Sequence, residues 1–222
     1  MLHNTTLKFL KDLKKNNNKE WFDLHRKEYE AARKDHLQLV QEVIDLQGKK
    51  DPSIRLLTAK ECVFRINRDV RFSKDKSPYK INFGASINKG GKKSWNTAGY
   101  YFHIEPGKCF AGGGLYMPEA SVLKMVRQEI DYNLPEFQKI LSNKKFRTLY
   151  GDLDRSKDIS LTRVPKGYEP DNPAADHLKL KGFIAMVDIP DEIITSKDAA
   201  KKIATAFETL MPLIEFLNRA GE

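Results

Sequence analysis

Residues 99–115 constrain the fold of this chain most, because they contain two strand-like segments separated by a turn signal. Within Gly99–Glu105, apolar side chains alternate with polar ones, and this period of two is typical of a half-buried strand. Pro106 and Gly107 form a turn signal, after which Lys108–Leu115 again has strand character. Consecutive strands usually lie side by side, so the segment predicts a strand pair with one apolar and one polar face.

Further strands and several helices are predicted on both sides of this pair. Period-two patterns predict strands at Glu61–Asn67 and Ile81–Ile87, and a last strand is predicted at Phe183–Ile189. Asn18 is a natural helix N-cap, and residues 195–198 have the sequence of a capping box. Apolar spacing predicts helices at Thr5–Lys14, Lys19–Gln47, 118–131, Pro135–Leu141 and Phe146–Tyr150, and a final helix after Asp198 that Pro212 should kink or interrupt.

The composition favours one folded domain over two small ones. The chain has 222 residues, 40% of them hydrophobic, and no linker rich in Pro, Gly or Ser divides it. We therefore expect a single α+β domain over residues 1–222, with a largely antiparallel sheet and helices packed on one face. No run approaches the roughly 18 apolar residues of a membrane helix, and the N-terminus lacks an apolar signal segment. A cytoplasmic location without membrane association is therefore expected.

Cysteine and histidine spacing indicates no metal or cofactor site. Cys62 and Cys109 are isolated and lie in strand-like runs, where a cysteine is usually a small buried hydrophobe. His25 and His36 lie eleven residues apart, which is not the i, i+4 spacing of a helical metal site. Both histidines are interpreted as core or edge residues, and neither a structural metal ion nor a cofactor is expected.

A basic segment between two of the predicted strands concentrates the unusual chemistry of the chain. Ten Lys and Arg residues but only three acids lie between residues 60 and 93, so this window holds seven of the nine net positive charges. Arginine suits bidentate capture of a phosphate or carboxylate, and Asp69 and Asp75 are placed to orient the arginines. Aromatic residues among the charges, including Phe72 and Tyr79, favour an anchored loop; the alternative is a solvated loop with internal ion pairs. The candidate ligand-binding residues are Arg65, Arg68, Arg71, Lys76, Tyr79, Lys80 and Tyr101.

The polar face of the predicted sheet also supplies a candidate acid–base pair. Arg65, His103 and Glu105 are predicted to face the same side, provided that their strands share one sheet. His103 would act as acid or base with Glu105 as its partner, while the arginines would stabilise developing charge. No nucleophile–base pair or metal triad with a recognisable motif accompanies them. A polar face that simply meets water is the alternative.

Long motifs are spread over nearly the whole chain. The longest, Phe64–Lys80, reads F-R-I-N-R-D-V-R-F-S-K-D-K-S-P-Y-K. It resembles the signature of a widespread uncharacterised family, the domain of unknown function 2461. The resemblance implies a single soluble α+β domain and no particular activity. One departure is Asn172-Pro173, where the family pattern has His-Pro, so no role of that histidine carries over. The other matching motifs are Trp21-Phe22, Gly99–Gly107, Gly112–Pro118, Leu161–Tyr168 and Leu217-Asn218.

Three classes of function are compatible with these features. The first is binding of a phosphate-bearing or other anionic ligand (a nucleotide, a sugar phosphate or nucleic acid) at the basic loop, with Tyr79 or Tyr101 available to stack on a base. The second is a hydrolase or transferase that acts on a phosphate ester or acidic metabolite through His103 and Glu105. The third is a protein–protein interaction module that uses the basic loop. Arginines that converge with His103 in a concave site would favour the enzyme.

Overall fold

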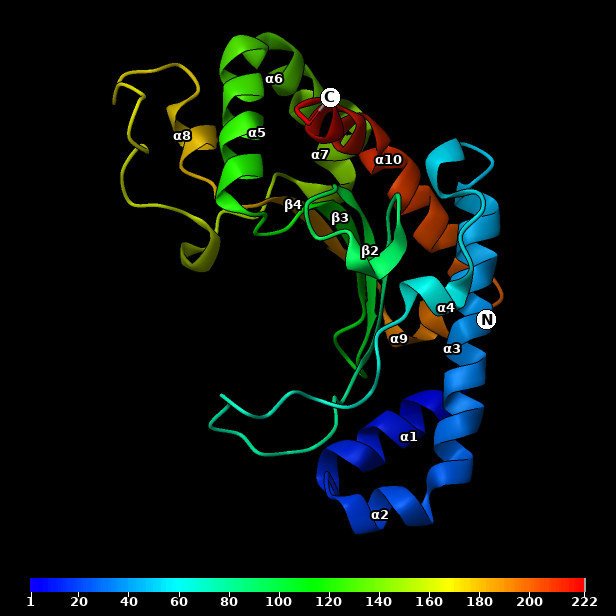
Figure 1. The fold of residues 1–222 in the computed structure, drawn as a ribbon. Helices are drawn as coiled ribbons and strands as arrows, with labels where there is room; N and C mark the ends of the chain where they lie inside the picture. Colours follow the sequence, from blue (N-terminus) through cyan, green and yellow to red (C-terminus); the bar gives the residue numbers. More distant parts are fainter. Residues whose placement is uncertain (222) are drawn as a thin grey trace.

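The computed structural model describes residues 1–221 and contains one antiparallel four-stranded sheet in the order β1-β2-β3-β4 (Figure 1). Each strand therefore neighbours the next one along the chain, which agrees with the predicted α+β class and antiparallel pairing. The strands are β1 (Phe83–Ile87), β2 (Gly99–Ile104), β3 (Phe110–Leu115) and β4 (Phe183–Asp188).

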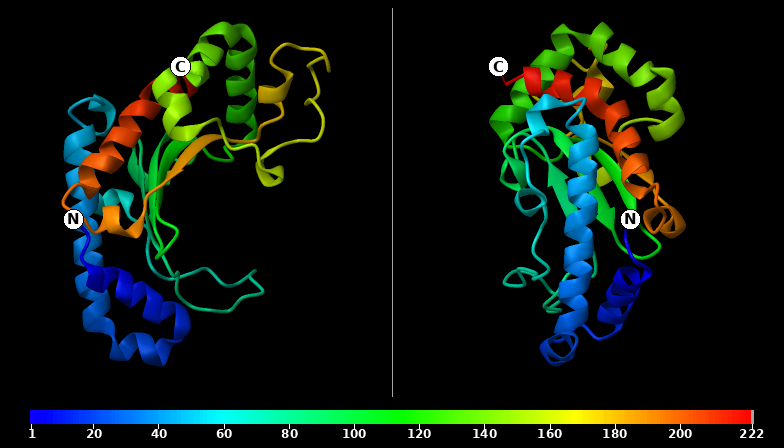
Figure 2. Two further views of the ribbon diagram at one scale, coloured as in Figure 1. Left: turned by 180° about the vertical axis from the view of Figure 1, so that it is seen from behind. Right: turned by 90° about the vertical axis from the view of Figure 1, so that its right-hand side faces the viewer.

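Ten α-helices occur in the described residues. The two longest, α3 and α10, lie against the sheet, and α1 packs on α3. The right view of Figure 2 shows α3 and α10 in front of the strands. The helices are α1 (Asn4–Lys15), α2 (Lys19–Leu24), α3 (Arg26–Gln47), α4 (Ala59–Cys62), α5 (Ala120–Tyr132), α6 (Leu134–Ser142), α7 (Lys144–Tyr150), α8 (Ala175–Leu178), α9 (Asp191–Ile194) and α10 (Ala199–Arg219).

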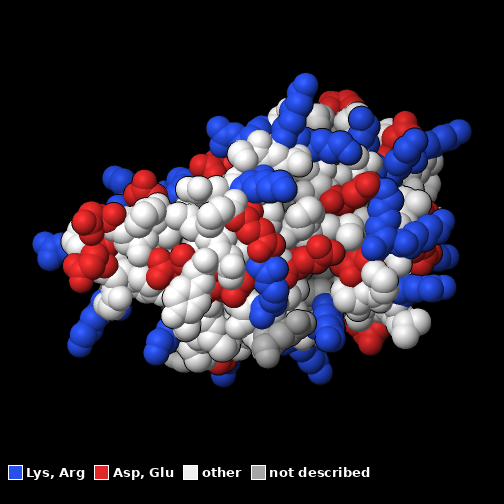
Figure 3. Space-filling view, turned by 90° about the horizontal axis from the view of Figure 1, so that it is seen from above, with Lys and Arg blue, Asp and Glu red and all other residues white. Residues whose placement is uncertain are grey.

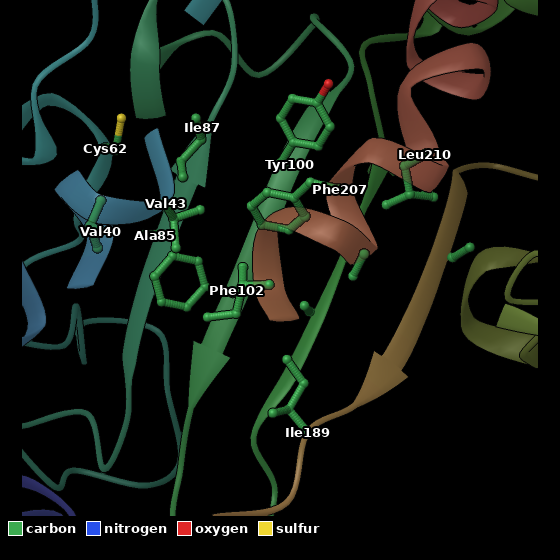
Figure 4. Packing of buried hydrophobic residues seen from close by; sticks show 14 of the residues in the cluster. Val40, Val43, Cys62, Ala85, Ile87, Tyr100, Phe102, Ile189, Phe207 and Leu210 are labelled. Atoms are coloured by element: carbon green, nitrogen blue, oxygen red, sulfur yellow. The ribbon is translucent and has the colours of Figure 1, made fainter. Parts of the chain in front are cut away.

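One face of the sheet is covered by these two helices and forms the centre of the core. Tyr100, Phe102 and Ile104 of β2 point to this face and are at most 1% exposed. Phe207 of α10 stacks on Tyr100 with ring centroids 4.8 Å apart. Val40 of α3 belongs to the same core and lies nearer to β1 (Figure 4). Helices thus pack on one face of the sheet, as the period of β2 predicts.

The opposite face of the sheet is flanked by two irregular segments, one at each edge. Phe64 N–H donates to the Gly84 carbonyl of edge strand β1 (3.1 Å), and Asp154 N–H donates to the Ile184 carbonyl of edge strand β4 (2.8 Å). From these attachments, residues 64–82 and 151–182 extend on the side of the sheet away from α3 and α10 (Figures 1 and 2). The uncovered face therefore lies between two projecting segments.

Two of the predicted elements are wrong. Residues 61–67 do not form a strand: Thr58 N–H donates to the Glu61 carboxylate (2.8 Å) and caps a helical turn, α4, after which only isolated bridges pair the chain with the sheet region. The predicted helix 19–47 divides at His25 into α2 and α3. The His25 ring and its backbone N–H both bond to the Trp21 carbonyl, and the chain changes direction there.

Helix ends follow the local prediction in one case and contradict it in another. Asn18 caps α2 as predicted, because its side chain accepts from Trp21 N–H (2.9 Å). The predicted capping box at 195–198 does not form: the Thr195 hydroxyl instead donates back to the Asp191 carbonyl at the end of α9 (2.9 Å). Helix α10 begins at Ala199 and continues through Pro212 without interruption.

Candidate functional site

Two adjoining pockets open on the uncovered face of the sheet. The first, of about 410 Å³, is called the basic pocket; the second, of about 620 Å³, is called the aromatic pocket. Phe64, Lys80 and Tyr101 line both, so the two pockets adjoin, and together they are called the recess. The basic pocket is lined by Phe64, Arg65, Arg68, Asp69, Lys80, Asn82, Gly84, Tyr101 and His103.

Two cations of the basic pocket make no direct ion pair, although the Asp69 carboxylate lines the same pocket and its pKa is lowered in part by the charge of Arg65. Within residues 1–221, the side chains of Arg65 and Lys80 make no salt bridge and no hydrogen bond. Burial lowers the pKa of Lys80, and the positive charge of Arg65 lowers it further. Like charges held together in a partly buried pocket repel each other, and an anion bound between them would remove that repulsion.

Arg68 lies in the same pocket but is held by the protein. Its guanidinium contacts Asp75, the Ser77 carbonyl (3.2 Å) and the Ser73 hydroxyl (3.3 Å). Hydrogen bonds from Ser77 and from Arg68 lower the pKa of Asp75 to about 2, so this carboxylate stays ionised at neutral pH. Asp75 therefore orients an arginine as predicted, which leaves Arg68 positioned before any ligand binds.

Arg71 and Lys76 lie outside the pocket, at the far end of the 64–82 segment. Both Arg71 nitrogens that face Asp69 bond to its carboxylate (Nε–Oδ1 3.0 Å, Nη2–Oδ2 2.7 Å), and 76% of the arginine side chain is exposed. Lys76 Nζ donates to the Val70 carbonyl (3.0 Å). Neither side chain lies beside Arg65 in the pocket, because Arg71 bonds to Asp69 and Lys76 bonds to the Val70 carbonyl. Of the three arginines, only Arg65 and Arg68 therefore line the basic pocket.

The aromatic residues of the segment have opposite surroundings. Tyr79 is buried and stacks on Phe22 of α2 (centroids 4.0 Å apart), and the Asn17 amide bonds to the Tyr79 backbone in both directions. The segment is thus anchored, as predicted. The same burial makes the prediction that Tyr79 stacks on a ligand wrong. Phe72 is 96% exposed at the tip and anchors nothing.

Tyr101, His103 and Glu105 form a connected polar row on the uncovered face. His103 lines the basic pocket together with Arg65. Its Nε2 lies 3.5 Å from Glu105 Oε2, and its Nδ1 lies 3.1 Å from the Tyr101 hydroxyl. An ionised Glu105 only accepts hydrogen bonds, so Nε2 carries the proton and Nδ1 accepts from Tyr101. His103 and Glu105 also line a third pocket of about 510 Å³ next to Cys109.

Burial shifts the proton affinities of this row. It lowers the pKa of His103, against the opposing effect of the Glu105 carboxylate, so the neutral imidazole is favoured. It raises the pKa of Tyr101 to about 12, so the phenol keeps its proton at neutral pH. The row therefore combines a neutral imidazole, a phenol that donates and a carboxylate, next to two unpaired cations.

The aromatic pocket contains residues that sequence reasoning missed. Trp95 and Tyr116 line it with 68% and 62% of their surfaces exposed, while Gly112 and Gly114 of β3 form its floor. Trp95 follows Ser94 and precedes Asn96 and Thr97, so a tryptophan inside a polar turn was the available signal. The backbone of β4 approaches both glycines closely and leaves no room for a side chain at either position.

The remaining candidates have structural surroundings. Asn172 donates to Asp131 of α5 (2.7 Å) and accepts from Ala174 N–H (2.6 Å), so it fixes the turn before α8. Cys62 and Cys109 are buried free thiols, and burial raises their pKa values to about 11 and about 12. Over residues 1–221, no cluster of three or more His, Cys, Asp or Glu side chains is arranged to hold a metal ion. None of the described helices is both long and apolar enough to cross a bilayer.

The anchored basic segment and the glycine-rich strand that frame this recess are also the chain's most distinctive motifs. A family described as "Conserved hypothetical protein (DUF2461)" matches residues 5–216. The chain belongs to the DUF2461 family. The match includes every element that lines the two pockets. No curated protein and no solved structure matches the chain.

Proposed function

We propose that this DUF2461 protein binds a phosphate-bearing or similarly anionic small molecule in the basic pocket. The observation that carries the proposal is the pair Arg65 and Lys80, which line one pocket and make no ion pair in the described residues. Arg68 adds a third cation that Asp75 and Ser73 already orient. Forked guanidinium donors match the geometry of phosphate oxygens, and donors that are positioned in advance lose less entropy on binding.

The charge distribution elsewhere supports a local site rather than a generally basic surface. At the end of the molecule that carries α5, α6 and the C-terminus, Lys and Arg are interspersed with Asp and Glu (Figure 3). Arg71, at the tip of the basic segment, is likewise neutralised by Asp69. Generic attraction of polyanions requires clustered charge of one sign. What distinguishes the basic pocket is that three cations, Arg65, Arg68 and Lys80, line it together.

The test compares Arg65→Ala with Arg71→Ala in titrations with pyrophosphate, sugar phosphates and nucleotides at two salt concentrations. Both variants lose one arginine, but only the first loses a group that lines the pocket. Arg65→Ala should weaken binding by about 1.5–3 kcal/mol, the range for a hydrogen bond to a charged group, or roughly ten- to a hundredfold. Arg71→Ala should change binding by less than about 1 kcal/mol, and that change should disappear at the higher salt concentration.

Equal losses in the two variants, with binding that disappears in salt for wild type as well, would show a nonspecific basic surface and overturn the proposal. Lys80→Ala provides a second pocket variant, and Lys76→Ala is its control because Lys76 bonds to a backbone carbonyl outside the pocket. Both control residues are exposed at the tip of the segment, so their replacement leaves the fold intact.

The Tyr101–His103–Glu105 row favours a second candidate, acid–base chemistry on a phosphate ester or acidic metabolite bound in the same pocket. Nδ1 of His103 accepts from the Tyr101 hydroxyl, so Tyr101 would give its proton to Nδ1 while it takes one from the substrate, and Glu105 would stabilise the imidazolium that forms. Arg65 and Lys80 would then stabilise negative charge that develops on the substrate. The test is hydrolysis of p-nitrophenyl phosphate by wild type and His103→Gln. Turnover that His103→Gln abolishes while pyrophosphate still binds supports this candidate, and no turnover by wild type removes it.

A further inference from the structure

The aromatic pocket continues from the basic pocket along a row of rings. Lys80 Nζ lies 5.2 Å from the centre of the Phe64 ring, in the position of a cation–π contact. The Phe64 ring centre lies 6.4 Å from that of Tyr101 and 6.4 Å from that of Trp95. If the phosphate of a ligand binds Arg65 and Lys80, the rest of the ligand can therefore contact the rings of Phe64, Tyr101 and Trp95.

The floor of the aromatic pocket is bare backbone. A Cβ atom at Gly112 would lie 2.4 Å from the Ala185 carbonyl oxygen, and one at Gly114 would lie 1.9 Å from the Phe183 oxygen. Gly114 also has φ +119°, a conformation that residues with a side chain rarely adopt. Close strand pairing thus excludes side chains from the middle of β3. The backbone is consequently open to the pocket at this point, between the side chains of Tyr101 and Met186, and offers a surface for a planar ring.

The walls carry aromatic surface that no other part of the protein covers. Trp95 and Tyr116 border the pocket and are more than half exposed. A single exposed apolar residue needs no explanation, but two exposed aromatics around one recess of about 620 Å³ mark a binding site. Aromatic faces of this kind stack on nucleobases, and the stacking is tolerant of base identity.

The polar groups of the aromatic pocket include two carboxylates and a buried amide, besides Lys92 and several hydroxyl groups. Asn88 lines it and is 6% exposed; its Nδ2 donates to the Ser94 and Thr97 carbonyls, which leaves Oδ1 without a donor in residues 1–221. Asp154 and Asp158 line the same pocket. Asn88 Oδ1 is itself buried, so the acceptors open to a ligand are the two carboxylates, and a ligand that brings N–H or O–H groups gains hydrogen bonds there. Arg65 and Arg68 line only the basic pocket, whereas the two aspartates line only the aromatic pocket. Lys92 also lines the aromatic pocket, but its Nζ donates to the Lys60 and Val63 carbonyls (3.0 and 2.6 Å).

We propose that the recess binds a mononucleotide, with its phosphate in the basic pocket and its base in the aromatic pocket against Trp95 and Tyr116. This inference rests on the proposed function, to which it adds the substrate class and a second set of binding residues. A base with an exocyclic amino group, as in adenine or cytosine, supplies donors that the Asp154 and Asp158 carboxylates accept. A longer nucleic acid fits less well, because Arg71 and Lys76 are engaged within the segment and provide no track for further phosphates.

The experiment measures binding of AMP, CMP, UMP, ribose 5-phosphate and adenosine by calorimetry. AMP and CMP should bind roughly five- to a hundredfold more tightly than ribose 5-phosphate, the range that stacking of one base provides. Trp95→Ala should remove most of that difference and leave ribose 5-phosphate binding unchanged. Phe72→Ala is the matched control, since Phe72 is an exposed aromatic outside both pockets, and it should change nothing. Circular dichroism verifies that each variant is folded.

Each outcome separates this inference from the proposed function. If ribose 5-phosphate binds as tightly as every nucleotide, and Trp95→Ala has no effect, the base site is overturned while phosphate binding stands. If adenosine binds as tightly as AMP and loses affinity in Trp95→Ala, the base site stands and the phosphate proposal fails. If an oligonucleotide binds far more tightly than AMP and Phe72→Ala weakens it, the mononucleotide assignment is overturned. If none of the five compounds binds, both proposals fall.

Discussion

The two faces of strand β2 carry adjacent tyrosines with opposite surroundings. Tyr100 lies in the core, where its hydroxyl donates to Asp51 (2.8 Å) and accepts from buried Gln47 (3.1 Å). Tyr101 points to the uncovered face, where its hydroxyl meets only His103 in the described residues. Neighbouring residues of a strand point to opposite faces of the sheet. Tyr100 therefore contacts helices α3 and α10, whereas Tyr101, the next residue, lines both pockets.

Two histidines extend this comparison. His36 of α3 packs between Phe83 and Phe102 on the covered face, and its Nε2 has no hydrogen-bond partner in residues 1–221. His103 lies on the uncovered face with a partner at each ring nitrogen. A buried imidazole without partners contributes packing and is penalised when charged, whereas a partnered one next to a pocket can exchange a proton. The covered face thus favours stability, and the uncovered face retains polar groups that packing does not require.

The largest expected effect is the loss of packing on the covered face. Phe102→Ala should lower the free energy of unfolding by about 3–5 kcal/mol, because a fully buried ring leaves a cavity under α10. Tyr101→Ala removes a ring of similar size from the uncovered face and should cost less than half as much. Urea denaturation of both variants measures the difference. Losses of equal size would mean that both faces of β2 support the fold alike.

The next expected effect is on the pH dependence of stability. Burial lowers the pKa of His36 to about 3, with a smaller contribution from Arg33. Below pH 6.5 the unfolded chain therefore binds a proton that the folded protein excludes. The free energy of unfolding should fall as the pH decreases, by up to about 1.4 kcal/mol per unit between pH 6.5 and 3. His36→Phe should reduce this slope in urea titrations at pH 7 and pH 5, whereas His103→Gln should retain most of it.

The smallest expected effect comes from single hydroxyl groups. Tyr100→Phe should destabilise the protein by about 1–2 kcal/mol, because it leaves the buried amide of Gln47 without its acceptor. Tyr101→Phe should change stability by less than about 0.5 kcal/mol, because its partner is half-buried and lies beside a pocket that water can enter. Thermal unfolding of the two variants side by side tests this. A larger loss in Tyr101→Phe would reverse the roles assigned to the two faces.

The sequence predicts the sheet well because its strands obey one simple rule. The alternation in β2 correctly assigns Tyr100 and Phe102 to the core and Tyr101 and His103 to the opposite face. The same rule fails at 61–67, where the local bond between Thr58 and Glu61 favours a helical turn over a strand. Periodicity describes which face a residue occupies once an element exists, but it does not decide between competing local hydrogen bonds.

The candidate site is only partly predictable, for a different physical reason. Composition locates the basic segment, but Arg65 and Arg71 are equivalent in sequence, and only the fold of the loop gives one a partner and leaves the other facing a pocket. Phe72 and Tyr79 are likewise indistinguishable until α2 supplies Phe22 to one of them. The aromatic pocket was missed because it combines side chains from segments distant in sequence, among them Trp95, Tyr116 and Asp158.

The attachments of the two projecting segments affect whether the sheet can pair with strands of other copies of this protein. Exposed edge strands offer unpaired N–H and C=O groups to any other chain, and such edges promote aggregation. Here Phe64 bonds to edge strand β1 and Asp154 bonds to edge strand β4, so both sides of the sheet are partly closed. The segments that flank the recess thus also protect the sheet from strand addition. A substitution that detached either segment would expose the edge strand that the segment now covers, and this strand could then pair with a strand of another molecule.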